Sequence, residues 1–96
     1  MAAKSFGNDA HFQDNLIDFL NTEMDLGFTF CRDAQTQLEA KDPDHYVLLL
    51  EKAGTSLETV RRFEERIADP ELWRRIHERA DRLENLISRS GDFSLS

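Results

Sequence analysis

Asp42-Pro43-Asp44 is the stretch that decides the fold, and its pattern returns as Asp69-Pro70-Glu71. Each is typical of the start of an α-helix. The aspartate accepts hydrogen bonds from the first free backbone amides, the proline fits the first helical position, and the next acid suits the positive end of the helix dipole. The chain has no other proline. Two helix starts inside the chain therefore predict three helices.

The predicted helices cover about residues 9–41, 43–68 and 70–89. Apolar residues recur at three- and four-residue spacing in the last two segments, which indicates one buried stripe per helix. Gly91 is a fitting C-terminal stop for the third helix. Because the connections have only two or three residues, we expect an all-α, up-down-up bundle of three antiparallel helices. Residues 8–90 would form this single domain, with flexible ends at 1–7 and 91–96.

Composition narrows the class of protein. A chain of 96 residues, 40% hydrophobic and 32% charged, is typical of one small globular domain. Its net charge of −7 disfavours nucleic acid and anionic lipid as partners. No apolar run approaches the ~20 residues of a membrane span, and no signal-peptide core follows Met1. Cys31 is the only cysteine, so we expect a reducing, cytoplasmic location without disulfides.

Charge is unevenly distributed along the chain. Residues 1–60 carry eleven acids against four bases, whereas residues 61–96 carry eight of each. A basic tract that binds nucleic acid is one hypothesis for the second part, through Arg75, Arg79, Arg82 and Arg89. Acids interleave with these arginines at helical spacing, as in Glu78 and Arg82, so an ion-paired, solvated helix face is the favoured interpretation.

The sequence contains few candidates for chemistry. His45 lies near one end of the predicted bundle, His11 near the other and His77 between them, so the three histidines do not converge and no metal site is expected. A glycine-rich phosphate loop, a Ser-His-acid set and paired cysteines are all missing from the sequence. Cys31 falls on the apolar side of its helix, where thiols are usually inert. We expect neither a cofactor nor an enzyme.

Glu23 interrupts the apolar face of the first helix. An acid on that face needs a partner, and Arg61 is level with it when residues are counted back from the turn at Asp42. A cross-helix ion pair between Glu23 and Arg61 is the favoured interpretation. The alternative is a ligand-binding or enzymatic site in which a partly buried cluster of Glu23, Arg61 and His77 surrounds a pocket.

The first helix carries two apolar stripes that together span roughly 200°, wider than the ~100° of an ordinary surface helix. One stripe consists of Phe12, Leu16, Phe19, Leu26 and Phe30. The other consists of Ile17, Met24, Phe28 and Cys31. Either both stripes are core, or the second one is an interaction face. Because the predicted third helix is too short to cover the first completely, a homodimer through this face is slightly favoured.

Leu26-Gly27-x-x-Phe30 resembles the Leu-Gly-x-x-Tyr core of a tetratricopeptide-repeat helix. In the best register, the second-helix positions of the repeat fall on Tyr46, Leu50 and Ala53, where Tyr46 departs from the small residue of the pattern. Residues 20–60 are also similar to small uncharacterised bacterial helical proteins with one such hairpin. The resemblance implies a small protein-protein interaction or self-association module.

Overall fold

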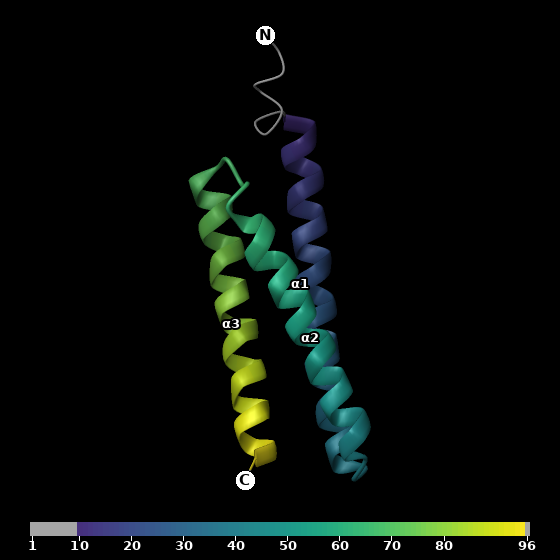
Figure 1. Ribbon diagram of the computed structural model, residues 1–96. Helices are drawn as coiled ribbons and strands as arrows, with labels where there is room; N and C mark the ends of the chain where they lie inside the picture. The colour runs from purple at the N-terminus through teal and green to yellow at the C-terminus, as the bar shows by residue number, and fades with distance from the viewer. Residues whose placement is uncertain (1–9, 96) are drawn as a thin grey trace.

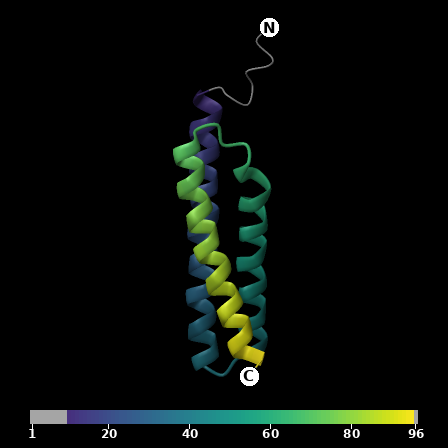
Figure 2. The same ribbon diagram turned by 90° about the vertical axis from the view of Figure 1, so that its left-hand side faces the viewer.

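The computed structural model describes the backbone of residues 10–95 and the side chains of residues 10–90. Its helices are α1 (Ala10–Glu39), α2 (Pro43–Glu64) and α3 (Pro70–Leu95). They run in alternating directions, joined by two short connections (Figures 1 and 2). The predicted all-α, three-helix, up-down-up architecture is confirmed, with no strand between residues 10 and 95. The segment 1–7 lies outside the described residues.

An aspartate caps the N-terminus of each of the two predicted helices, α2 and α3. The Asp42 carboxylate accepts a hydrogen bond from the backbone N–H of His45 at 3.2 Å, and the Asp69 carboxylate accepts one from the backbone N–H of Glu71 at 2.8 Å. These bonds satisfy amides that have no partner within the helix. Local sequence therefore sets where α2 and α3 begin.

The end of α2 comes earlier than predicted, at Glu64 instead of about residue 68. Gln13 of α1 binds the backbone of the segment that follows α2. Its side-chain oxygen accepts from the Ala68 N–H at 2.9 Å, and its amide donates to the Arg66 carbonyl at 3.1 Å. The first bond occupies the Ala68 N–H, which a longer α2 would use within itself. The second connection is therefore set by a contact from α1.

The predicted stop of α3 at Gly91 is wrong, because the helix continues to Leu95. Glycine inside a helix costs only about 1 kcal/mol relative to alanine, and no proline follows it. In addition, the Tyr46 hydroxyl of α2 donates to the Ser90 carbonyl at 2.6 Å, which fixes the last turns of α3 against the start of α2. The segment 91–96, predicted to be flexible, is thus helical as far as Leu95.

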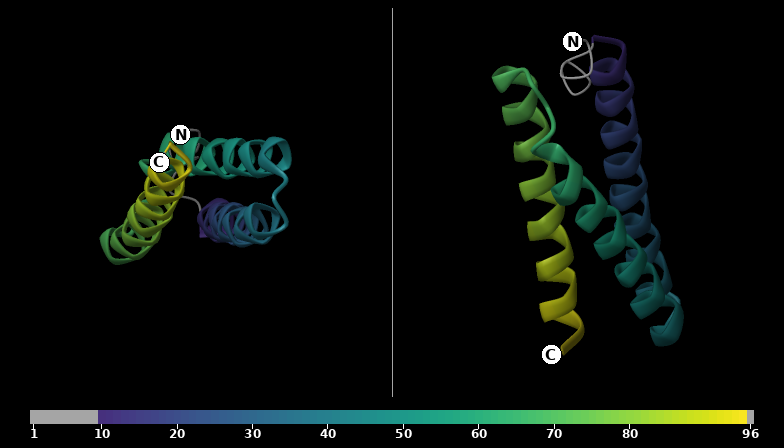
Figure 3. Two further views of the ribbon diagram at one scale, coloured as in Figure 1. Left: turned by 90° about the horizontal axis from the view of Figure 1, so that it is seen from below. Right: turned by 45° about the horizontal axis from the view of Figure 1, so that its top comes forward.

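The core is divided into three clusters along the bundle. The largest joins all three helices near the α2–α3 connection and contains Leu16, Leu20, Met24, Val60, Ile67, Ile76 and Ala80. A second cluster contains Cys31, Ala53 and Leu83. The third contains Ala34, Tyr46 and Leu49, which belong to α1 and α2 only. Correspondingly, the C-terminal end of α3 stands apart from the α1–α2 turn (Figures 1 and 3).

No helix in the described part of the chain is long and apolar enough to cross a membrane.

Gly27 and Gly54 offer a matched test of how closely α3 approaches α1. A Cβ atom on Gly27 would lie 2.6 Å from Cδ2 of the buried Leu83, whereas one on Gly54 would meet nothing within 4 Å. We expect Gly54→Ala to raise the free energy of unfolding by about 0.5–1 kcal/mol, because alanine favours helix. Gly27→Ala should lower it by about 1–2 kcal/mol, because overpacking outweighs that gain. Urea denaturation measures both, and equal stabilisation would contradict the close α1–α3 contact.

Candidate functional site

The predicted interaction face on α1 is mostly core. Met24 is 0% exposed and Cys31 is 2% exposed, while Ile17 and Phe28 are half-buried against the core clusters. The prediction that this stripe is a free surface is therefore wrong. It is covered because α2 and α3 pack against it: Met24 lies in the cluster that contains Val60 and Ile76, and Cys31 lies in the cluster that contains Leu83. Phe28 is the member of the set that also lines a surface cleft.

Cys31 is buried in the core. Burial raises the pKa of its thiol above the ordinary value, so the thiolate is disfavoured at neutral pH. The side chain packs in the core with Ala53 and Leu83. It acts as a small apolar residue.

The structure does not bring Glu23 and Arg61 together. Within the side chains of residues 10–90, the carboxylates paired with Arg61 are those of Glu64, Asp81 and Glu84. Glu23 is only half-buried and keeps access to water, so it does not require an ionic partner. The predicted Glu23–Arg61 pair is thus replaced by a different set of contacts around Arg61.

Glu64 is the acid that lies in the core. It is 8% exposed and interrupts the apolar stripe of α2 between Val60 and Ile67. Glu23 interrupts the apolar face of α1 in the same way, and a partner is predicted from the sequence for Glu23 only. Both positions carry the same pattern, and only the packing of α3 shows which acid is enclosed.

Arg61 links α2 to α3 through a polar cluster. Its Nη2 atom lies 2.7 Å from Asp81 Oδ1 and 2.6 Å from Glu84 Oε1, and its Nη1 atom lies 3.5 Å from Glu64 Oε2. One guanidinium therefore serves three carboxylates, two of which belong to α3. The planar fork of arginine suits such multiple contacts.

His77 completes the cluster. Its Nδ1 atom lies 3.1 Å from Glu64 Oε1 and 3.3 Å from Arg61 Nη1. A hydrogen on Nδ1 satisfies the shorter contact, because the carboxylate can only accept. The Trp73 ring stacks on the imidazole, with centroids 4.4 Å apart and an interplanar angle of 13°. The imidazole is therefore fixed by Glu64 on its edge and Trp73 on its face.

The cluster is built as an ionic cross-link. The hydrogen bond from Arg61 lowers the pKa of the Asp81 carboxyl, with a further lowering from the nearby His77, so Asp81 stays ionised at neutral pH. No group of three or more His, Cys, Asp or Glu side chains among the described residues is arranged to hold a metal ion. Arg61 and His77, which only the alternative hypothesis grouped, lie 3.3 Å apart, and Glu64 takes the place that this hypothesis gave to Glu23.

A second feature is an exposed apolar region on the side of α1 that faces away from α3. Phe19 and Leu26 are each 42% exposed. The Phe19 ring meets the Phe63 ring of α2 edge to face, with centroids 6.0 Å apart. Phe12 and Phe19 line a shallow hollow of about 250 Å³ together with Phe63. This region belongs to the apolar stripe that sequence reasoning assigned to the core side.

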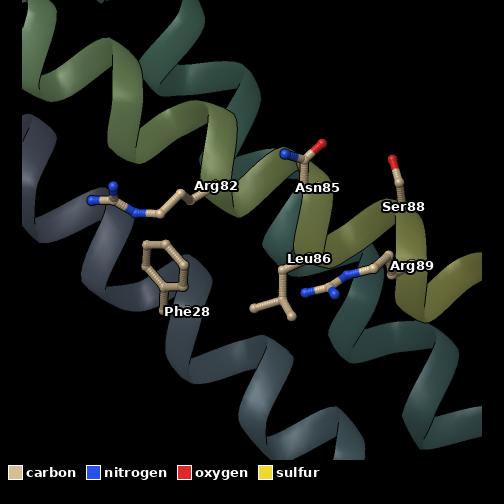
Figure 4. Close-up of a pocket in the computed structure, with 6 residues that line it drawn as sticks. All are labelled: Phe28, Arg82, Asn85, Leu86, Ser88 and Arg89. Atoms are coloured by element: carbon tan, nitrogen blue, oxygen red, sulfur yellow. The ribbon is translucent and has the colours of Figure 1, made fainter.

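A third feature is an open cleft between α1 and α3 (Figure 4). It has a volume of about 550 Å³ and is lined by Phe28, Arg82, Asn85, Leu86, Ser88 and Arg89. Phe28 and Leu86 face each other across the cleft, with the side chains of Arg82 and Arg89 on either side. At one end, Arg79 lies 5.7 Å above the Phe28 ring.

No protein-family model matches the chain, and neither a curated protein nor a solved structure does. The resemblance of residues 20–60 to a tetratricopeptide-like hairpin therefore rests on the residues that suggested it, Leu26, Gly27 and Phe30.

Proposed function

We propose that this protein is a self-association module that forms a homodimer through the outward side of α1. The observation that carries the proposal is the exposure of Phe19 and Leu26, each 42%. These residues lie seven positions apart, so they share one side of the helix. Large apolar side chains repeated on an exposed helix face are typical of a surface covered by a partner.

The stripe around these residues has the spacing of a helix-pairing seam. We call it the outward stripe, and it consists of Phe12, Asn15, Phe19, Thr22, Leu26 and Thr29. Phe12, Phe19 and Leu26 recur every seven residues, and the polar members recur every seven residues between them. Two-helix seams use this alternation of three- and four-residue steps. None of these six residues is charged, and the next position of the seven-residue series is Asp33.

In an antiparallel pair centred between Thr22 and Glu23, Phe19 would meet Leu26 of the partner subunit. This contact occurs twice because a two-fold axis relates the copies. Asp18 and Asp33 border the outward stripe on each copy, and their like charges would oppose pairing at low salt. Apolar burial drives the association, so added salt should strengthen it.

Light scattering tests the proposal through Leu26→Glu. The parent should have twice the chain mass of 11.1 kDa, about 22 kDa, at micromolar concentration. Leu26→Glu should give a folded monomer, because it places like charges in the seam on a side chain already 42% exposed. Val47→Glu is the control, because Val47 is 49% exposed on α2 and lies outside the outward stripe. A parent of 11.1 kDa at high concentration, or a dimeric Leu26→Glu variant, would show that the seam is not used.

We also propose that the protein is not an enzyme and acts in the cytoplasm. The polar cluster favours a structural role, because Arg61 engages the carboxylates of Asp81 and Glu84 directly. The unpaired Cys31 suits a reducing compartment.

A further inference from the structure

We propose that the cleft between α1 and α3 binds an acidic, amphipathic helix of a partner protein. We call it the arginine cleft and define it by Phe28, Arg82, Leu86 and Arg89, the residues that offer either an apolar contact or a positive charge. This site is separate from the outward stripe. Phe28 follows Leu26 by two residues, so its side chain is rotated about 200° from that of Leu26 around the axis of α1.

The shape of the arginine cleft suits an extended occupant. A second hollow of about 410 Å³ shares Leu86 and Arg89 with the first and continues to Gln35 and Ser90. The two hollows therefore follow α3 from Arg82 to Ser90, about 12 Å at 1.5 Å per residue. That length corresponds to about two turns of a partner helix, the usual scale of helix-in-groove recognition.

The floor of the cleft is apolar. Phe28 and Leu86 are half-buried and pack against the core cluster of Cys31, Ala53 and Leu83. Figure 4 shows both side chains at the cleft, where an aliphatic side chain of an occupant would contact them. An apolar anchor placed between two cations is the recognition pattern of an amphipathic helix with acidic flanks.

The charges of α3 are sorted between its two sides. Asp81 and Glu84 turn toward α2, where Arg61 binds them, while Arg82 and Arg89 lie at the cleft on the α1 side. The predicted pair of Glu78 with Arg82 is not formed, because Glu78 binds Arg74 instead. Among the described side chains, no acid pairs with Arg82 or Arg89.

The two guanidinium groups therefore face the cleft ready to bind an acid. Arg82 and Arg89 are seven residues apart on α3, so their Cα atoms are separated by about 10 Å along the axis. Two carboxylates seven residues apart on a partner helix have the same separation, and arginine pairs with carboxylates in a bidentate geometry. The net charge of −7 does not prevent this, because salt screens distant charges beyond about 8 Å.

Fluorescence anisotropy tests the proposal with a defined probe. The probe is a fluorescein-labelled helical peptide with leucine along one face and glutamates seven residues apart beside it. The matched peptide carries lysine at each glutamate position. We expect saturable binding of the acidic peptide only, and the double change Arg82→Ala with Arg89→Ala should weaken it about tenfold.

A second double variant, Arg62→Ala with Arg74→Ala, removes the same charge from exposed sites outside the arginine cleft. It should leave the affinity for the acidic peptide unchanged. Leu26→Glu should also leave that affinity unchanged, which would show that the arginine cleft does not depend on the proposed dimer. Circular dichroism confirms that each variant is folded. Amide shifts of the labelled protein should be largest around Phe28 and Leu86.

Four results would overturn the proposal. They are no saturable binding at about 1 mM peptide, equal binding of the lysine peptide, an unchanged affinity in the Arg82 and Arg89 double variant, and tighter binding of a single-stranded oligonucleotide. The last result would show that the arginines recognise phosphate and not carboxylate.

Discussion

Replacing Tyr46 with alanine is expected to lower the free energy of unfolding by about 3–5 kcal/mol, the usual cost of removing a buried aromatic side chain. Tyr46 is 2% exposed and is among the largest fully buried side chains. Its ring packs in the cluster that closes the α1–α2 turn, beside Ala34 and Leu49. Its hydroxyl also binds the Ser90 carbonyl at 2.6 Å. One side chain therefore holds the start of α2 to both other helices.

Tyr46→Phe separates the ring from the hydrogen bond. It keeps the packing and removes the donor, so we expect a smaller loss of about 1–2 kcal/mol. Hydrogen exchange should quicken in the last turns of α3, because their link to α2 is lost. Urea denaturation followed by circular dichroism measures the stabilities. If Tyr46→Phe costs as much as Tyr46→Ala, the ring contributes little and this explanation is wrong.

The sequence predicted features that depend on neighbouring residues. Asp42 and Asp69 cap the helices that follow them because an aspartate and the amides it binds are only two or three residues apart. The end of α3 was not predictable in this way. The contact that holds α3 to α2 near this end comes from Tyr46, which is 44 residues away from Ser90. In the sequence, Tyr46 stands out only as larger than the small residue of the tetratricopeptide pattern.

The sequence indicates a wide apolar surface on α1, but not how that surface is oriented in the bundle. Periodicity shows how many degrees of a helix are apolar, and it does not show where the neighbours pack. Met24 and Cys31 therefore belong to the core, while Phe19 and Leu26 are exposed. The arginine cleft depends on the angle between α3 and α1, and no local pattern in the sequence encodes that angle.

Glu64, the buried acid, shows the same limit of prediction from helical periodicity. The rule that an acid on an apolar face needs a partner is sound, and it applied equally to Glu23 and Glu64. Counting residues from the turn placed Glu23 level with Arg61, but helix rotation decides which side chains meet. Arg61 turns toward Glu64 and α3 instead.

Replacing Arg61 with methionine should lower the free energy of unfolding by about 2–3 kcal/mol at neutral pH. Removing one partner of a buried ion pair leaves an uncompensated charge, and here Glu64, whose side chain is 11% exposed, keeps only His77. The 27% exposure of the Arg61 side chain places the loss below that of a fully buried pair. Methionine keeps most of the side-chain volume, so lost packing contributes little.

Arg74→Met is the matched control. Arg74 also serves two carboxylates, those of Glu71 at 2.7 Å and Glu78 at 3.2 Å, but all three side chains are more than half exposed. Water replaces such contacts readily. We therefore expect a far smaller change than for Arg61→Met, and equal effects would show that burial of Glu64 does not matter.

The pH dependence of the stability loss in Arg61→Met tests whether that loss is electrostatic. The hydrogen bond from Arg61 holds the pKa of the Asp81 carboxyl below its ordinary value of 3.8. A carboxyl with a lowered pKa stabilises the fold above its ordinary pKa, and this contribution is lost as the pH falls through the lowered value. The stability difference between the parent and Arg61→Met should therefore be largest at neutral pH and shrink below about pH 4. A difference that stays constant through this range in urea denaturation would assign the effect to packing instead.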